Sequence, residues 1–398
     1  MTKKSDAPAI RFKGFSDAWE QRKLGDIADI VGGGTPSTGN QSYWDGDIDW
    51  YAPAEIADQI YANSSQKKIT GLGYENSSAK MLPPGTVLFT SRAGIGKTAI
   101  LTRKGCTNQG FQSIVPHRGE LDSYFIFSRT EELKRYGELV GAGSTFVEVS
   151  GKQMAVMELM MPPTMREQQT IGGFFQQLDH LITLHQRKFE KLTNVKKSML
   201  EKMFPQNGSS YPEIRFKGFT DPWEQRKFEE IAVRSSVICS DDTLPRVEYE
   251  DIVSGTGRLN KDIYAKQSSK SGIVFHQGDV LYGKLRPYLQ NWLLPTFDGL
   301  AVGDFWVLQP QNADSSFLYR LIQSRQFDEV ANQSTGTKMP RADWKLVSKT
   351  VFSIPSNISE QAAIGTYFTA LDSLITLHQR ELEKLQNIKK SMLEKMFV

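Results

Sequence analysis

The sequence is poor in the residues that build disulfide frameworks and metal sites. It has only two cysteines, Cys106 and Cys239, in unlike surroundings, and five histidines that form no cluster. This pattern gives neither paired cysteines nor metal-ligand spacing. We therefore expect a protein of a reducing compartment, the cytoplasm, with no metal or other cofactor of its own.

Long apolar runs and a strong excess of one charge are also missing. The N-terminal residues lack the apolar stretch of a signal peptide, and no segment has the unbroken apolar run that spans a bilayer. Lys and Arg number 48 against 45 Asp and Glu, a net charge of +3. The missing apolar runs predict neither secretion nor membrane insertion, and the mildly basic charge permits nucleic-acid binding without arguing for it. A length of 398 residues favours two domains.

What the sequence does contain is a duplication. Residues 167–204 and 360–397 align without a gap, with 27 of 38 positions identical. The segment IRFKGFSDAWEQRK from Ile10 returns as IRFKGFTDPWEQRK from Ile214. The chain is therefore two tandem units whose ends repeat closely, while the sequence between those ends diverges.

Each long repeat predicts an amphipathic helix, because its apolar residues recur at intervals of three and four. Thr164 and Ser359 precede the repeats as candidate N-caps. About 33 residues would make a helix of roughly 50 Å, and its narrow stripe favours a coiled coil with its twin, in antiparallel pairing. A homodimeric zipper is the alternative. The predicted seam comprises Leu178, Ile182, His185, Phe189 and Leu192 in the first copy, and Leu371, Ile375, His378, Leu382 and Leu385 in the second.

A histidine in each seam raises the question of a metal or a proton switch. No second ligand lies at the i+3 or i+4 position of either histidine. We therefore expect His185 and His378 to be hydrogen-bonded to each other or to a nearby carboxylate.

The segments between the repeats read as short β-strands broken by glycine and proline, with short helices among them. The predicted fold class is α+β, mixed α/β in each half, with two globular domains in tandem, two long helices and pseudo-twofold symmetry. The expected boundaries are 10–164 for the first globule, 165–204 for the central helix, 205–213 for a linker, 214–357 for the second globule and 358–397 for the C-terminal helix.

Two motifs suggest an enzyme and fail on inspection. SRAGIGKT, from Ser91 to Thr98, resembles a phosphate-binding P-loop, but Ser91 stands where the motif needs its first glycine. Asp122 with Glu132 suggests a nuclease site, yet the segment reads as a surface helix with ordinary ion pairs. A P-loop ATPase or nuclease remains the least favoured alternative, and we expect the chain to perform no chemistry alone.

Basic and amide residues on predicted turns are the candidates for DNA contact. Arg and Lys can hold phosphates or read guanine, and Asn or Gln can read adenine. Such residues recur at equivalent places in both halves, which favours binding over surface solubility. The candidates are Arg92, Lys97, Asn108, Gln109, Ser144, Thr145 and Lys152 in the first half, and Lys284, Arg286, Tyr288, Lys338 and Arg341 in the second.

With these residues named, the whole chain resembles the specificity (S) subunit of type I restriction-modification systems. The most specific matches are the repeated LITLHQR helix, GDVLYGKLRPYL from Gly278, and the GSTFVEVSGKQM loop from Gly143. The resemblance implies two target recognition domains that each bind one half of a bipartite asymmetric site in double-stranded DNA. It also implies a helix pair that sets the spacer and docks the partner subunits. A coiled-coil scaffold without DNA reading is the alternative.

The same resemblance assigns the chemistry to partners. Two modification subunits would carry S-adenosylmethionine and methylate adenine. Two restriction subunits, ATP- and Mg-dependent motor nucleases, would cut DNA. The chain itself would be a non-catalytic subunit of the resulting endonuclease.

Overall fold

The computed structural model describes residues 7–57, 59–92, 94–142, 148–206, 208–265, 268–333 and 339–397. The chain forms two compact units. The first comprises Met1–His185 with Glu381–Val398, and the second comprises Gln186–Arg380. Each unit therefore contains one globule and a part of each long helix.

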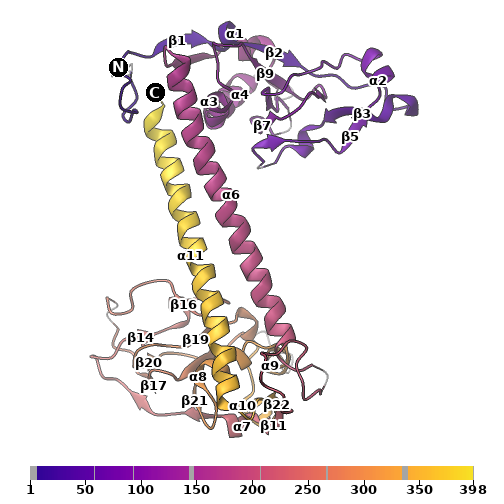
Figure 1. Ribbon diagram of the computed structural model, residues 1–398. Coiled ribbons are helices and arrows are strands. Elements are labelled where there is room, and N and C mark those ends of the chain that lie inside the picture. Colours follow the sequence, from indigo (N-terminus) through magenta and orange to yellow (C-terminus); the bar gives the residue numbers. More distant parts are fainter. Residues whose placement is uncertain are drawn as a thin grey trace. The chain divides into compact units, whose positions relative to one another are not determined.

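The globule of the first unit is built on β-sheets (Figure 1). A five-stranded sheet has the order β2-β9-β6-β7-β4, a three-stranded sheet has the order β5-β3-β8, and β1 pairs with β10. Strand β9 ends at a proline, as the sequence predicted. The strands are β1 Glu20–Lys23, β2 Ala28–Gly32, β3 Trp44–Tyr51, β4 Tyr61–Ala62, β5 Lys67–Ile69, β6 Val87–Phe89, β7 Thr98–Leu101, β8 Cys106–Thr107, β9 Gln112–Pro116 and β10 Glu158–Met161.

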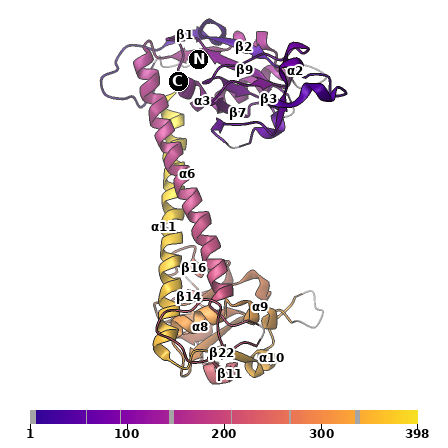
Figure 2. The same cartoon turned by 45° about the vertical axis from the view of Figure 1, so that its right-hand side comes forward.

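Short helices cover the five-stranded sheet, and α3 contacts β6 and β7 (Figure 2). Asp122 begins α3 because its side chain accepts hydrogen bonds from the amides of Tyr124 and Phe125. Thr164 caps the long helix as predicted, accepting from the Glu167 amide at 3.3 Å. The helices are α1 Leu24–Ile27, η1 Gln41–Tyr43, η2 Pro53–Glu55, α2 Gly71–Glu75, α3 Ser123–Ser128, α4 Thr130–Gly141, α5 Gly151–Ala155 and α6 Met165–Lys202.

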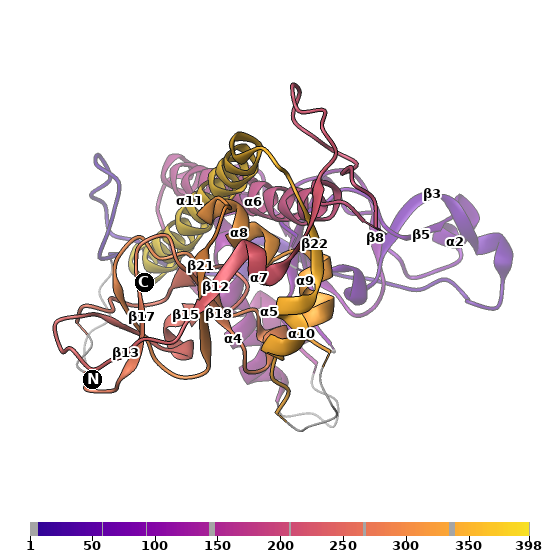
Figure 3. The ribbon, with the colours of Figure 1, turned by 90° about the horizontal axis from the view of Figure 1, so that it is seen from below.

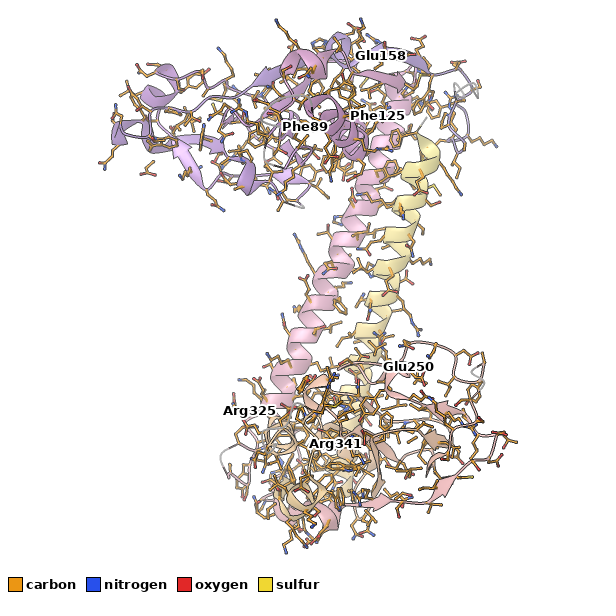
Figure 4. The ribbon with its side chains drawn as sticks, turned by 180° about the vertical axis from the view of Figure 1, so that it is seen from behind. Phe89, Phe125, Glu158, Glu250, Arg325 and Arg341 are labelled. Atoms are coloured by element: carbon orange, nitrogen blue, oxygen red, sulfur yellow. The ribbon has the colours of Figure 1, made fainter. Side chains whose placement is uncertain are left out.

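The core of the first unit joins the globule to both long helices. Phe89, Phe125 and Phe175 are fully buried in it, and Figure 4 labels Phe89 and Phe125 within this globule. Phe397, from the end of α11, stacks on Phe175 with ring centroids 5.8 Å apart. The last turn of α11 thus packs on the first turns of α6, so the two helices run antiparallel in this unit.

The second unit repeats this plan with different sheets. One four-stranded sheet has the order β12-β21-β18-β19, and another has the order β13-β17-β20-β14. β12, β21 and β18 lie next to one another in Figure 3. β11 pairs with β22, and β15 with β16. The strands are β11 Glu224–Lys227, β12 Ala232–Ser235, β13 Ile238–Cys239, β14 Arg246–Val247, β15 Ile252–Val253, β16 Arg258–Leu259, β17 Gly272–Phe275, β18 Val280–Gly283, β19 Trp292–Leu293, β20 Gly299–Ala301, β21 Phe305–Pro310 and β22 Val351–Ile354.

One expected helix cap of the second unit is wrong. Asn357, not Ser359, begins the second long helix, because its side chain accepts from the Ser359 amide at 2.8 Å. Ser359 lies inside the first turn, since the helix starts one residue earlier. The helices are α7 Phe228–Ile231, η3 Tyr249–Asp251, η4 Pro287–Leu289, α8 Ser315–Leu321, α9 Arg325–Ala331, α10 Trp344–Lys349 and α11 Ile358–Met396.

A buried ion pair fastens each opening segment to the start of a long helix. Arg11 donates two hydrogen bonds to Glu167, at 2.7 and 2.8 Å, and the indole of Trp19 donates a third at 3.2 Å. Glu167 is only 1% exposed. The second unit builds the same arrangement from Arg215, Trp223 and Glu360. The duplicated opening segment is therefore a structural clamp.

The opening segments also meet the ends of the long helices. The amide of Ile10 donates to the carbonyl of Lys395 at 2.9 Å, and that of Ile214 donates to the carbonyl of Lys202, also at 2.9 Å. In the first case the two residues are far apart in the chain, and in the second they are near neighbours.

In the described part of the chain, no helix is long and apolar enough to cross a membrane.

Candidate nucleic-acid interface

The loop between β6 and β7 presents two of the predicted residues of the first globule. Arg92 forms a β-bridge with Glu148, and its guanidinium lies 2.6 Å from the carboxylate. Lys97 is exposed at the other end of the loop, where its amide donates to the hydroxyl of Thr90 at 3.0 Å. Both cations therefore stand on a short turn whose backbone is held at its base.

The other predicted residues of this globule surround that turn. Asn108 and Gln109 lie in the loop before β9, which is joined to the turn by a hydrogen bond from the Ser91 amide to the Gly110 carbonyl at 2.8 Å. Asn108 accepts from the Gly110 amide at 2.7 Å, so its side-chain oxygen is occupied inside its own loop. Lys152 is exposed on α5.

Three predicted residues, Ser144, Thr145 and Lys338, lie outside the described residues. The segments that follow them are described. Val149 donates to the Ser91 carbonyl at 3.1 Å, and the side chain of Ser150 caps α5. The loop that resembles the family motif therefore returns to the turn that carries Arg92.

In the second globule the structure brings two of the predicted cations, Lys284 and Arg341, to one acid. Asp304 accepts from Arg341 at 2.9 Å and lies 3.5 Å from the ammonium of Lys284. Arg341 is 57% exposed, and Figure 4 labels it on this globule. Leu285 and Arg341 form a β-bridge. The carboxylate thus holds two cations from separate loops on one surface.

Asp304 was missed by the sequence reasoning. Burial acts to raise the pKa of its carboxyl, but hydrogen bonds and charge from Arg341 and Lys284 outweigh it and hold the pKa below the ordinary value. Its carbonyl accepts from the hydroxyl of Tyr249 at 2.6 Å, and the Tyr249 ring packs on Phe305 with centroids 4.6 Å apart. Nothing in the local sequence marks this residue, because its partners lie 20 and 37 positions away.

Arg286 and Tyr288 lie on a turn with an unusual backbone. Arg286 has φ +50° and Gln290 has φ +56°, and they flank the short helix η4. Non-glycine residues in the left-handed region cost on the order of 1 kcal/mol each. The turn is held by a hydrogen bond from the Arg286 amide to the Pro340 carbonyl at 2.7 Å, and by one from Gly255 to the Gln290 carbonyl at 3.0 Å. At its tip Tyr288 is 56% exposed.

The geometry does not form the P-loop or the nuclease site that two sequence motifs suggested. After Lys97 the chain enters β7 at Thr98, whereas a P-loop leads into a helix whose N-terminus holds the phosphate. Asp122 caps α3, and Glu132 pairs with Arg129 at 2.7 Å. Among the described residues, no group of three or more His, Cys, Asp and Glu could hold a metal ion.

The family model of the type I restriction modification DNA specificity domain matches residues 16–194 and 222–387. These two matches cover most of the chain, once for each duplicated unit. The chain belongs to this family. It is a specificity subunit of a type I restriction-modification system.

Known specificity subunits are similar along the whole length of the chain. The MjaIX specificity subunit of Methanocaldococcus jannaschii is 26% identical over 404 residues, covering 95% of this chain and 92% of that protein. The MjaVIII subunit of the same organism is 20% identical over 401 residues, covering 94% and 91%. A crystal structure of the S subunit of a type I system from M. genitalium matches with TM-score 0.64 and 13% identity, covering 98% of this chain and 99% of that one. That likeness supports the fold.

The predicted seam of this specificity subunit lies on the long helices. Leu178, Leu371 and Leu382 are buried, and the other seven residues are partly buried. Between them Leu181, Leu184, Leu374 and Leu377 are 38–51% exposed, which the seam pattern did not single out. These four leucines occupy the same positions of both copies.

Ion pairs between the helices lie beside the seam. Lys389 is 2.6 Å from Asp179 in the first unit, and Lys196 is 2.7 Å from Asp372 in the second. Burial lowers the pKa of Lys196, against the opposing effect of Asp372. Tyr124 donates to Asp179 at 2.8 Å, and burial together with that carboxylate raises the pKa of its hydroxyl.

Proposed function

We propose that each globule of this specificity subunit binds one half of a bipartite, asymmetric site in double-stranded DNA. The observation that carries the proposal is a pair of equivalent β-bridges. Arg92 faces Glu148 in the first globule, and Leu285 faces Arg341 in the second. Each residue of the second bridge lies 193 positions after its counterpart in the first (285 − 92 and 341 − 148), which is also the offset of the long repeats (360 − 167). Equivalent positions of the scaffold thus carry different side chains in the two halves.

Different side chains at one scaffold position are what two unlike half-sites require. Basic side chains at these turns would hold phosphates and fix the register on the duplex, while direct contacts to base edges would set the sequence. The candidates remain Arg92, Lys97, Asn108, Gln109 and Lys152 in one globule. In the other they are Lys284, Arg286, Tyr288 and Arg341, with Asp304 orienting two of them.

The long helices would set the spacer between the half-sites and dock the partners. Exposed leucines at identical positions of both copies suit two copies of one partner better than two unrelated proteins. We propose two modification subunits bound in this way, with two restriction subunits completing the nuclease. S-adenosylmethionine, ATP and Mg would be bound by those partners, in the cytoplasm, where the host DNA lies.

The test is methylation mapping by long-read sequencing in a host that expresses the chain with its modification subunit. Replacing residues 24–163 by the corresponding segment of another specificity subunit should change one half-site and leave the other unchanged. A simultaneous change in both half-sites would contradict the assignment of one globule to each.

A second mapping experiment addresses the helices. Four residues inserted into one helix add about 6 Å, against about 3.4 Å per base pair of duplex. We expect a spacer longer by one or two base pairs with both half-sites unchanged. An unchanged spacer with altered half-sites would refute the proposed role of the helices.

A further inference from the structure

The strained turn of the second globule ends in two exposed apolar side chains. Tyr288 is 56% exposed and Leu289 is 38% exposed, while Pro287 before them is buried. Among the described residues the Tyr288 side chain makes no hydrogen bond or ring contact. The two side chains therefore project from the tip of the turn, where a partner can reach them.

The backbone below the tip is held rigidly. Arg286 and Gln290 both adopt the left-handed conformation, on either side of η4. Leu289 donates to the Arg286 carbonyl at 2.8 Å, and its own carbonyl accepts from the hydroxyl of Ser254. Strain that the surrounding structure maintains is characteristic of functional sites. Here it fixes the direction in which the two side chains project.

Charge around the tip suits a nucleic-acid partner. Arg286 is exposed at its base, and Lys284 and Arg341 lie on the adjoining backbone, where Ala342 donates to the Lys284 carbonyl at 2.8 Å. Asp304 contacts two of these three cations, Arg341 and Lys284, and its single negative charge leaves a net positive charge around the tip. An apolar tip beside cations matches DNA-binding proteins that use Arg and Lys together with an apolar side chain inserted between base steps.

The equivalent turn of the first globule lacks such a tip. By the 193-residue offset, Ile95 corresponds to Tyr288 and Gly96 to Leu289. Ile95 is only 7% exposed, and a side chain at Gly96 would collide with Lys134 of α4. This turn packs against its own globule, so the exposed apolar tip is found only in the second of these two equivalent turns.

We propose that Tyr288 and Leu289 form a wedge that enters between two adjacent base pairs of the half-site bound by the second globule and unstacks that step. The inference rests on the proposed function, because it takes duplex DNA as the ligand of this surface. It adds a distortion of the DNA that is confined to one half-site. Truncating the wedge should weaken binding on the order of ten-fold, the loss typical for a base-stacking side chain.

The test uses the complex of this chain with its modification subunit and duplexes carrying the site found by methylation mapping. 2-Aminopurine, which fluoresces when unstacked, replaces one base at a time outside the methylated adenines. We expect a rise in fluorescence at one step of the second half-site and none in the first. Tyr288→Ala and Leu289→Ala should abolish the rise, and Tyr288→Phe should retain it.

Tyr211→Ala is the matched control, since Tyr211 is 54% exposed in the linker. It should leave both binding and fluorescence unchanged. If the wild-type complex binds the mapped duplex but every step stays quenched, the wedge is refuted while the proposed function stands, even if Tyr288→Ala weakens binding. If the complex shows no preference for the mapped duplex over a scrambled one, the proposed function fails and the wedge fails with it.

Discussion

The ammonium of Lys389 lies 2.6 Å from a carboxylate oxygen of Asp179, and the equivalent Lys196 lies 2.7 Å from Asp372. Both pairs join the two long helices, each within its own unit. The residues of the second pair differ from those of the first by the repeat offset of 193 (372 − 179 and 389 − 196). An Asp–Lys pair therefore specifies the register of the helices in each unit. The aspartate comes from α6 in the first unit and from α11 in the second.

Removing the acid of the second pair should cost more than removing its lysine. Asp372 also accepts from Arg320 at 2.7 Å, and Arg320 and Lys196 are 3% and 14% exposed. Asp372→Asn leaves two mostly buried cations without a counter-charge, so we expect a loss of about 3 kcal/mol. Lys196→Met leaves Asp372 paired with Arg320 and should cost less. Hydrogen exchange of residues 364–371 measures the difference, and equal losses would contradict this account.

The clamp on the opening segment should depend on the charge of Glu167. Glu167→Gln keeps the shape but loses the charge that holds Arg11, whose pKa is raised by its hydrogen bond to Glu167. We expect a loss of about 2–3 kcal/mol and faster hydrogen exchange in residues 20–23. Glu213→Gln is the control, because Glu213 pairs with Lys202 at the surface and is 67% exposed. Its loss should stay below about 1 kcal/mol.

Glycine should be better than the native residue at position 290. Gln290 has φ +56°, a conformation that glycine adopts without penalty. Gln290→Gly should therefore raise the free energy of unfolding by roughly 0.5–1 kcal/mol, whereas Gln290→Ala should not. Gln311→Gly, at an exposed position without positive φ, should lower stability. Denaturant unfolding followed by tryptophan fluorescence gives these values, and stabilisation by alanine would refute the strain argument.

The stability of the first unit should fall at acid pH through Asp49. Burial acts to raise the pKa of this carboxyl, but hydrogen bonds from Lys68 and Ser65 and the charge of Arg103 lower it from 3.8 to about 2. Because the pKa is lowered on folding, the stabilisation is present above about 3.8 and is lost as the pH falls toward about 2. It amounts to roughly 2 kcal/mol. The measurement is hydrogen exchange of β3 against pH, which Asp49→Asn should make flatter in this window.

The regular parts of the fold could be predicted because their signals are local. The stripes of the long helices, the proline that ends β9 and the Thr164 cap all depend on residues a few positions apart. Ser359 and Asn357 show the limit of such reasoning, since both can cap and only the backbone path decides between them. Asp304 was beyond reach, because its role depends on Arg341 and Lys284 being brought together by the fold.

The compact units are defined by packing between distant segments. The first unit ends at His185, inside α6, and resumes at Glu381, inside α11. Met396, the last residue of α11, is buried in the core of the first unit, and the partly buried Phe397 packs on Phe175 of α6. A repeat reveals which segments are alike, but it does not reveal which of them share a core.

The hydrogen bond from Ile10 to Lys395 has a consequence for how the chain is joined. The second globule starts beside the end of α6, the helix that precedes it in the chain. The first globule starts beside the end of α11, which is far from it in the chain. The amide-to-carbonyl distance is 2.9 Å in both cases. Each globule thus begins against the end of a long helix, in one case through residues close in the chain and in the other through residues far apart in it. The short path from Lys202 to Ile214 thus has a counterpart in the first unit that is made by contact alone.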